Sequence, residues 1–509
     1  MKTFVTCLIS VFCCLYQSVV AQNIVYTQTD KDLSTTTQFQ IMGKSKGNIL
    51  IYFYENDAHS IVLYNSQMEV IQKNSLKQLP NSIFNNECVQ VPDGFLLFYQ
   101  YQKKGIVYAM SLKIETDGSV KNEPQLLDTT DIDNTSANKI YKLIYSDDKQ
   151  YFMLIKENNS NSKRSILTTV LFENQLGLKL VNKVQNQIEM PDKYMALHEY
   201  QLDNDGDMLC VRTSGFSQSD QINKITILQK NKLVNTIEAV DLPVEELYLD
   251  DLKIKVDNRN KTFLLLSFFS KQKRGDIDGL FFCTWNKTLQ LVNKKATIPF
   301  DEELRRDANP ENNSKVAFND FFLRNIVLKQ DGSFIIAAEN VYSSSRGNNL
   351  NRWDYFNPSF GGGAFNNSYY GTGFGNSFFP WSRYNSFNNI NRYFAENVVI
   401  LSVNSGGELD WRNTVLKTQV DDNSDNFIGY GVLNSGSELH FLFNMQEKRQ
   451  TILSDQSITP EGQLIRLPAF RNLRTEYDFM PKFAKQTGLK QIVIPCLYRS
   501  YLCFSKIDF

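Results

Sequence analysis

Two copies of the tripeptide Ala-Glu-Asn place glutamates where a pair of carboxylates could do acid–base chemistry. Glu339 and Glu396 lie in two apolar stretches that flank a long insertion and are expected to pair as neighbouring strands. Two nearby carboxylates raise one pKa, and glycosidases use such a pair for catalysis. The alternative is a structural role, in which the glutamates pair with Arg346 and Arg392 at the base of the insertion. Glu339 and Glu396 are therefore weak candidates, and no catalytic residue is assigned.

The insertion between these glutamates has a composition suited to binding a partner. Residues 343–394 hold 15 aromatic residues among 52, with four arginines and one acid. Exposed aromatic rings are costly in water, and Tyr, Gly, Asn and Ser with Arg are typical of adaptable recognition loops. A flexible spacer is the alternative. The predicted partner-binding residues are Trp353, Tyr355, Tyr369, Tyr370, Trp381, Arg383 and Tyr384.

Other chemical motifs are weak. His59, His198 and His440 stand alone, and the HExxH, GxSxG and CxxC patterns do not occur, so each histidine is predicted to be structural. The segment 203–207 (DNDGD) resembles the start of a calcium loop. An EF-hand needs Gly at its sixth position and Glu at its twelfth, where this chain has Met208 and Ser214. A hairpin turn is therefore predicted, and neither a metal nor a cofactor is expected.

The elements that would position these residues are strands of one recurring kind. Short β-branched or aromatic stretches, most of them preceded by a turn signal such as Asp-Gly, occur eight times. They are residues 49–54, 95–101, 151–155, 208–212, 263–269, 334–338, 439–443 and 492–497. The first five begin 46, 56, 57 and 55 residues apart, and each core strand is followed by a second strand and a more polar third. This spacing is typical of propeller blades lengthened by loops.

The predicted fold is an all-β propeller in a single domain, residues 22–509, with the insertion in blade six. Eight blades are favoured, and seven blades with one irregular connection is the alternative; a β-sandwich would give shorter, less regular spacing. The last unit, residues 477–509, supplies only three strands. Residues 23–28 (NIVYTQ) are predicted to pair with this unit, which would close the ring and cover both sheet edges.

The N-terminus predicts export. Lys2, an uncharged run from Phe4 to Tyr16, and a small residue at Ala21 describe a signal peptide, residues 1–21. No later segment has the length of apolar sequence that a spanning helix needs. With 54 basic and 55 acidic residues and no basic block, nucleic-acid binding is not expected.

Five cysteines remain after the signal peptide. Cys496 and Cys503 could face each other if Arg499-Ser500 forms a two-residue turn. A disulfide there and buried free thiols both remain open.

The carboxyl-terminal third resembles a known group of proteins. Asp331-Gly332, Glu339, Gly407 and Trp411 are followed by Lys417, Gln419 and Asn444. This order is similar to that of uncharacterised secreted propeller-like proteins of Bacteroidota, over about residues 328–509. Asn397 stands where an acid is usual, and the loop is unusually rich in glycine. The resemblance implies export and a propeller-like fold, and it implies no activity.

The predicted function is that of an exported, non-enzymatic binding or scaffold protein, periplasmic or at the cell surface. Its partner would be an envelope protein or a glycan contacted through propeller loops, because the loops of such folds carry the function. One alternative is a carbohydrate-active enzyme that uses the glutamate pair. Another is an accessory subunit of an outer-membrane assembly.

Overall fold

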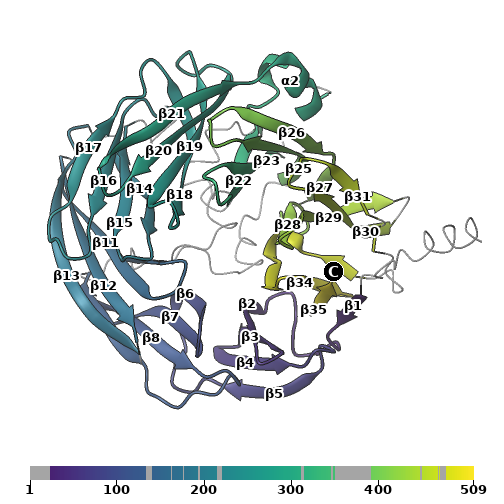
Figure 1. Ribbon diagram of the computed structural model, residues 1–509. Helices are drawn as coiled ribbons and strands as arrows, with labels where there is room; N and C mark the ends of the chain where they lie inside the picture. The colour runs from purple at the N-terminus through teal and green to yellow at the C-terminus, as the bar shows by residue number, and fades with distance from the viewer. Residues whose placement is uncertain are drawn as a thin grey trace, which may run out of the picture.

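The chain forms eight antiparallel sheets that follow one another in sequence and are arranged in a ring, as the computed structural model shows (Figure 1). The fold is an eight-bladed β-propeller, which confirms the prediction over its seven-bladed alternative. The structure describes residues 23–132, 140–161, 163–175, 177–192, 195–214, 221–310, 314–345, 348–349, 391–422, 424–447, 450–467, 469–470 and 477–509. The predicted signal peptide, residues 1–21, lies outside them.

The first four blades each contain four strands. Blade one holds β2 (Gln38–Ser45), β3 (Asn48–Glu55), β4 (Ala58–Tyr64) and β5 (Val70–Ser75). Blade two holds β6 (Phe84–Val91), β7 (Gly94–Lys103), β8 (Ile106–Ile114) and β9 (Gln125–Asp131). Blade three holds β10 (Tyr141–Tyr145), β11 (Tyr151–Asn161), β12 (Arg164–Asn174) and β13 (Leu178–Glu189). Blade four holds β14 (Ala196–Leu202), β15 (Met208–Thr213), β16 (Ile225–Lys230) and β17 (Glu238–Leu242).

The next three blades repeat the pattern with one elaboration. Blade five holds β18 (Tyr248–Asp257), β19 (Thr262–Ser270), β20 (Gly279–Asn286) and β21 (Leu291–Pro299). The connection to blade six contains helix α2 (Glu302–Ala308) and the 3-10 turn η1 (Ser314–Val316). Blade six holds β22 (Phe321–Leu328), β23 (Phe334–Ser345), β24 (Asn348–Asn349), β25 (Asn391–Val403), β26 (Leu409–Val415) and β27 (Gln419–Asp422). Blade seven holds β28 (Tyr430–Asn434), β29 (Leu439–Glu447), β30 (Gln450–Ile458) and β31 (Leu464–Arg466).

Blade eight joins the two ends of the chain. It holds β32 (Tyr477–Phe479), the 3-10 turn η3 (Pro481–Phe483), β33 (Lys485–Gly488), β34 (Gln491–Tyr498), β35 (Tyr501–Asp508) and β1 (Asn23–Tyr26). Strand β1 pairs with β35 from Asn23 opposite Asp508 to Tyr26 opposite Ser505. The ring is closed as predicted, by an N-terminal strand on the outer edge of the last blade.

The hydrophobic core consists of layers between neighbouring blades. In β19, Leu264, Leu266 and Phe268 pack toward blade six, whereas the alternate residues Phe263 and Leu265 pack toward blade four. Because successive side chains of a strand point to opposite faces, a strand enclosed by two blades needs apolar residues at almost every position. A layer of the same kind joins blade eight to blade one.

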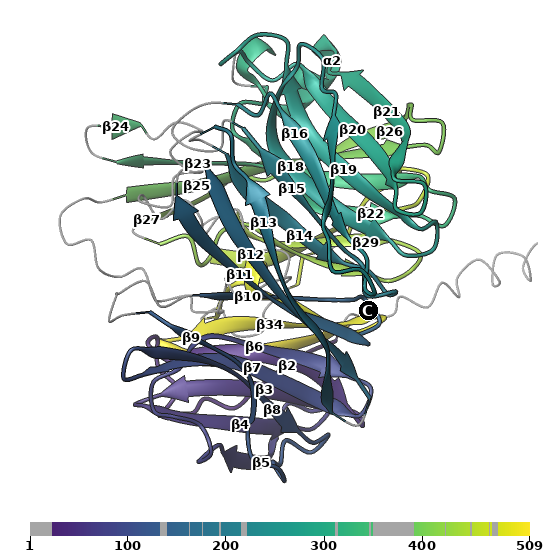
Figure 2. The ribbon, with the colours of Figure 1, turned by 90° about the vertical axis from the view of Figure 1, so that its left-hand side faces the viewer.

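The antiparallel strands assign the connections to two faces of the disc. The first face carries the turns between the first and second strands of each blade, and the second face carries those between the second and third. The insertion between β23 and β25 therefore belongs to the second face, where these strands extend beyond the other blades (Figure 2). Asn23 and the C-terminus lie on the first face.

One sequence expectation changes in detail, and one open alternative is decided. Strand β23 continues to Ser345 and β25 begins at Asn391, so both ends of the predicted insertion, 343–394, are paired strand rather than loop. Cys496 and Cys503 are register partners across a two-residue turn, as expected, and both are buried free thiols.

Candidate functional site

The predicted partner-binding residues lie outside the described part of the chain. They are Trp353, Tyr355, Tyr369, Tyr370, Trp381, Arg383 and Tyr384, within residues 350–390. The strands that lead to and from this segment are described, and they define how its two ends are held.

A paired ribbon forms the root of the insertion. Ser345 of β23 stands opposite Asn391 of β25, so the chain leaves and re-enters the fold at adjacent positions. Behind this point the rings of Tyr342 and Phe394 stack, with centroids 4.6 Å apart and an interplanar angle of 10°. Both residues are half-buried. The stack stiffens the ribbon at the base of the insertion.

A third strand widens the same ribbon. Strand β27 pairs with the first residues of β25, from Arg392 opposite Asp422 to Ala395 opposite Gln419. The Arg392 guanidinium donates to the Asp422 carboxylate at 2.8 Å. Pairing of Arg392 with one of the two candidate glutamates was the structural alternative, and the structure places Asp422 of β27 beside Arg392 instead. Arg346, the other expected partner, lies outside the described residues.

Glu339 lies in a buried ion-pair cluster. Its side chain is 1% exposed, with the Lys417 ammonium 2.9 Å and the Arg324 guanidinium 3.5 Å from its carboxylate oxygens. The Lys417 ammonium also donates to Gln419 Oε1 at 2.9 Å. The two cationic groups lie close enough to offset the charge of this carboxylate. These contacts give Glu339 a structural role that accounts for its burial.

Glu396 lies at a β-bulge next to this cluster. The register passes from Glu339 opposite Val398 to Val341 opposite Ala395, which leaves Glu396 in the irregular step. The Tyr342 hydroxyl donates to Glu396 Oε1 at 2.8 Å. Burial lowers the pKa of Lys417, and the negative charges of Glu339 and Glu396 both oppose that shift. The two glutamates therefore act on one lysine rather than forming an isolated carboxylate pair.

The partners Arg324 and Lys417 were not predicted. Arg324 is the extra residue of a bulge in the innermost strand β22, where Leu323 and Asn325 face consecutive residues of β23. Lys417 and Gln419 were noted only as part of the sequence resemblance. Gln419 accepts from Gly429 N–H at 2.8 Å and donates to the Asn444 carbonyl at 2.9 Å, which joins blade six to blade seven.

Each histidine has local partners. His59 lies 2.7 Å from the Tyr52 hydroxyl, and His440 Nδ1 lies 3.1 Å from Asp455. His198 lies 2.8 Å from the Thr213 hydroxyl, and burial lowers the pKa of its imidazole to about 3. His198 is therefore neutral at physiological pH, as is typical of a histidine held inside a fold.

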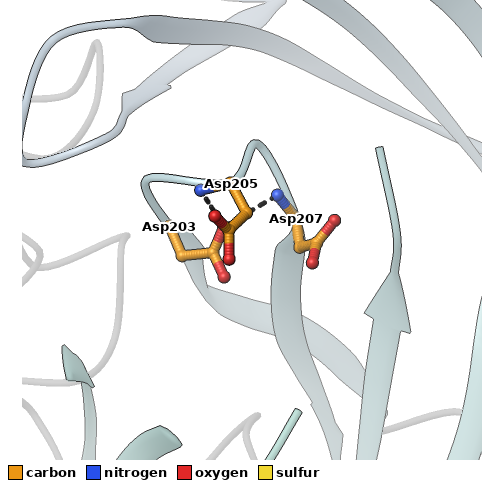
Figure 3. A group of neighbouring side chains, drawn as sticks. All are labelled: Asp203, Asp205 and Asp207. Atoms are coloured by element: carbon orange, nitrogen blue, oxygen red, sulfur yellow. Dashed lines mark hydrogen bonds between the residues drawn. The ribbon is translucent and has the colours of Figure 1, made fainter. Parts of the chain in front are cut away.

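The aspartate-rich segment forms a turn on the first face, between β14 and β15 (Figure 3). Asp203 Oδ1 accepts from the backbone N–H groups of Asp205 and Asp207, each at 2.9 Å. Carboxylate oxygens of the three aspartates lie within 4.8 Å of one another. The Lys287 ammonium from blade five contacts all three carboxylates, at 2.5 Å for Asp205 and 3.3 Å for Asp207.

Lys287 supplies the positive charge that these carboxylates require. Its side chain is 7% exposed and that of Asp203 is 2% exposed, so the contact is buried between blades four and five. Hydrogen bonds from Lys261 and Lys287 lower the pKa of Asp205 to about 2. A lysine thus occupies the position beside the turn that a bound cation would need.

Comparison with known proteins finds similarity to solved structures at low sequence identity. No known protein family and no curated protein matches the chain. Similar solved structures include an uncharacterised protein from Listeria monocytogenes EGD-e, at 9% identity over 80% of this chain and 90% of that one, with a TM-score of 0.34. An ulvan lyase, from a new family of polysaccharide lyases, has 8% identity over 94% and 95%, with a TM-score of 0.36. Prolyl oligopeptidase B from Galerina marginata has 9% identity over 92% of this chain and 56% of that one, with a TM-score of 0.40.

The architecture places the chain among eight-bladed β-propellers. Among the described residues, no helix combines the length and the apolar composition required to span a bilayer.

Proposed function

We propose that the protein is an exported, non-enzymatic binding or scaffold protein of the cell envelope. Its partner, an envelope protein or a glycan, contacts the residues inserted between β23 and β25. The observation that supports this proposal is the paired ribbon on the second face, which holds both ends of the aromatic-rich segment at Ser345 and Asn391. Binding residues often lie on loops that a rigid scaffold positions, and a segment held by the propeller has this arrangement.

The contacts of the two glutamates favour binding over catalysis. Glu339 is buried beside two cationic groups, and Glu396 accepts a hydrogen bond from Tyr342. A general acid or base must reach the proton that it transfers. Glu339 is 1% exposed, so acid–base chemistry at this pair receives no support from the geometry.

The decisive experiment removes the insertion while keeping its root. Replacing residues 346–390 with Asn-Gly joins Ser345 to Asn391 by a two-residue turn, which suits a pair of register partners. We expect this variant to fold, with an unchanged circular dichroism spectrum, and to lose capture of the partner from solubilised envelope fractions. Capture that survives the replacement would overturn the proposal.

Two further variants separate composition from spacing. In the first, a Gly/Ser/Asn segment of equal length replaces residues 346–390, and we expect no capture. In the second, Trp353→Ser and Trp381→Ser leave the rest of the segment intact, and we expect weakened capture. Normal capture by the equal-length variant would show that the segment is only a spacer.

Export is tested separately. We expect mature protein recovered from the envelope to begin at Gln22, after removal of residues 1–21. A mature chain that still begins at Met1 would contradict export by this signal.

A further inference from the structure

A group of ionisable side chains lies on or beside the innermost strands of four blades. Glu87 belongs to β6 in blade two, and Lys149 follows Tyr145 on the turn after β10 in blade three. Lys255 belongs to β18 in blade five, and Lys485 begins β33 in blade eight. We call Glu87, Tyr145, Lys149, Lys255 and Lys485 the axial cluster. Blades two, three, five and eight are not all neighbours, so the electrostatic interactions of Lys149 with Lys485 and Lys255 join blades that are not adjacent.

The hydrogen bonds of the axial cluster leave capacity unused. The Tyr145 hydroxyl donates to Glu87 Oε1 at 3.0 Å, whereas Glu87 Oε2 is buried and has no hydrogen-bond partner among the described residues. The Lys485 ammonium donates to the Met42 carbonyl of blade one at 2.9 Å. The Lys149 ammonium donates to the Ser146 carbonyl at 3.3 Å and lies 4.1 Å from the centre of the Tyr145 ring.

An ammonium has three donors, and these two lysines each place one on a neutral backbone oxygen. A buried polar group without a partner costs about 1–3 kcal/mol, and more when it is charged. The spare lysine donors therefore favour a ligand that offers hydrogen-bonding oxygens.

The electrostatics of the axial cluster indicate an excess of positive charge. Burial lowers the pKa of Lys149 to about 8, and the nearby ammonium groups of Lys485 and Lys255 lower it further. Burial also lowers the pKa of Lys485. The charge of Asp147, held by a 2.7 Å hydrogen bond from Asn258, acts in the opposite direction on Lys149.

Glu87 compensates this excess incompletely. Burial raises the pKa of its carboxyl to about 7, although the Tyr145 hydroxyl and both lysines favour the charged form. A large part of the Glu87 population is therefore protonated near neutral pH. The neighbouring Cys88 thiol adds no negative charge, because burial raises its pKa above the physiological range.

The Asp203 turn provides a contrast within the same molecule. There one buried ammonium, Lys287, contacts three carboxylates, so the positive charge is fully matched. In the axial cluster, three ammonium groups share Glu87 and Asp147. Buried charges are normally paired, and in the axial cluster the negative groups are fewer than the ammonium groups.

We propose that the axial cluster binds an oxyanion, the carboxylate or phosphate group of a small ligand. The oxyanion accepts hydrogen bonds from the Lys149 and Lys485 ammonium groups, and protonated Glu87 donates its O–H to the same group. Charge-assisted hydrogen bonds of this kind are stronger than neutral ones. The site is independent of the insertion on blade six, since none of its residues belongs to residues 343–394.

Isothermal titration of the full mature chain tests this site. The probes are inorganic phosphate and D-glucuronate at constant ionic strength, with D-glucose as a neutral control. We expect saturable binding of at least one anion and none of glucose, and the stronger probe identifies the class of oxyanion. Absence of saturable binding by both anions to the folded protein would overturn the proposal.

Three substitutions locate the binding. Lys149→Met and Lys485→Met should each weaken anion binding at least tenfold, whereas Lys149→Arg should retain most of it. Lys121→Met is the matched control, because its side chain is 69% exposed beside Glu115. Circular dichroism and thermal unfolding establish that each variant is folded, and Lys149→Met remains informative if Lys485→Met is not. Undiminished binding in folded Lys149→Met would also refute the site.

Proton uptake gives a second readout. A bound anion raises the pKa of both Lys149 and Glu87, so binding at pH 7.5 should take up protons. Titrations in two buffers with different ionisation enthalpies measure this uptake. We expect uptake by the wild-type chain and less by Glu87→Gln and Lys149→Met. Equal uptake in all three would contradict the assignment of these groups to the site.

Discussion

Replacing Tyr26 with alanine tests how much the closing strand contributes to stability. The Tyr26 ring stacks on Tyr477 with centroids 4.3 Å apart at an angle of 22°, and it lies 6.4 Å from the Phe479 ring. Tyr26 is half-buried. Alanine removes the buried part of the Tyr26 ring, and losing that buried apolar area costs about 2 kcal/mol. The lost stacking adds about 1 kcal/mol.

We therefore expect Tyr26→Ala to lower the free energy of unfolding by about 3 kcal/mol. An unfolding entropy of about 2.1 cal/mol/K per residue gives about 1 kcal/mol/K for a chain of 509 residues, so Tm should fall by about 3 °C. Equilibrium urea unfolding followed by tryptophan fluorescence measures the loss, and differential scanning calorimetry measures Tm.

Three other variants calibrate this measurement. Tyr26→Phe keeps the ring and should recover most of the loss. Val70→Ala, on the outer strand of blade one and 61% exposed, should change the free energy by less than about 0.5 kcal/mol. Deleting residues 23–27 should exceed the effect of Tyr26→Ala and promote aggregation, because it exposes the edge of β35. Wild-type unfolding of both Tyr26→Ala and the deletion would refute the view that β1 stabilises the ring.

Three further predictions concern buried charges. Lys287→Met leaves the buried Asp203 carboxylate without its cation and should cost about 3–5 kcal/mol in urea unfolding; a loss below about 1 kcal/mol would show that solvent compensates this carboxylate. Lys417→Met should cost a similar amount, and adding Glu339→Gln should restore part of it, whereas strictly additive losses in a double-mutant cycle would contradict the pairing. Burial raises the Glu87 pKa from 4.5 to about 7. At a pH between these two values, Glu87 keeps its proton in the folded chain and has lost it in the unfolded chain. Stability should therefore fall as pH rises from 4.5 to 7, and Glu87→Gln should flatten that slope; equal slopes in both proteins would place the Glu87 pKa near its ordinary value.

The second strand of every blade could be predicted from the sequence. All eight recurring stretches correspond to second strands, namely β3, β7, β11, β15, β19, β23, β29 and β34. These strands are enclosed by two neighbouring blades, so their residues are apolar on both faces and stand out in the sequence. The missing strand of blade eight could also be inferred, because a ring needs as many outer strands as blades.

The innermost strands were not predicted, and some of them carry buried charged residues. Several carry a bulge with a polar residue in it, such as Glu199 in β14, Asp251 in β18 and Arg324 in β22. A bulge interrupts the alternation of apolar and polar residues by which a strand is recognised in the sequence. A buried charged residue also interrupts the run of apolar residues on the buried face of the strand. Some of their partners belong to another blade, such as Lys253 of β18 for Glu199 of β14. Contacts of that kind depend on the closed ring and have no signature in local sequence.

The pairing of β1 with β35 determines how the ring responds to force. Asn23 and Asp508 are register partners, so both described ends of the chain lie at the same end of one antiparallel pair. Force applied between the termini peels this pair apart from that end, and the backbone hydrogen bonds break one after another rather than together. The closure is therefore the first part of the molecule to yield, at a load set by one or two hydrogen bonds. A tether attached through a single terminus transmits no such load, and the disc stays closed while its second face is pulled.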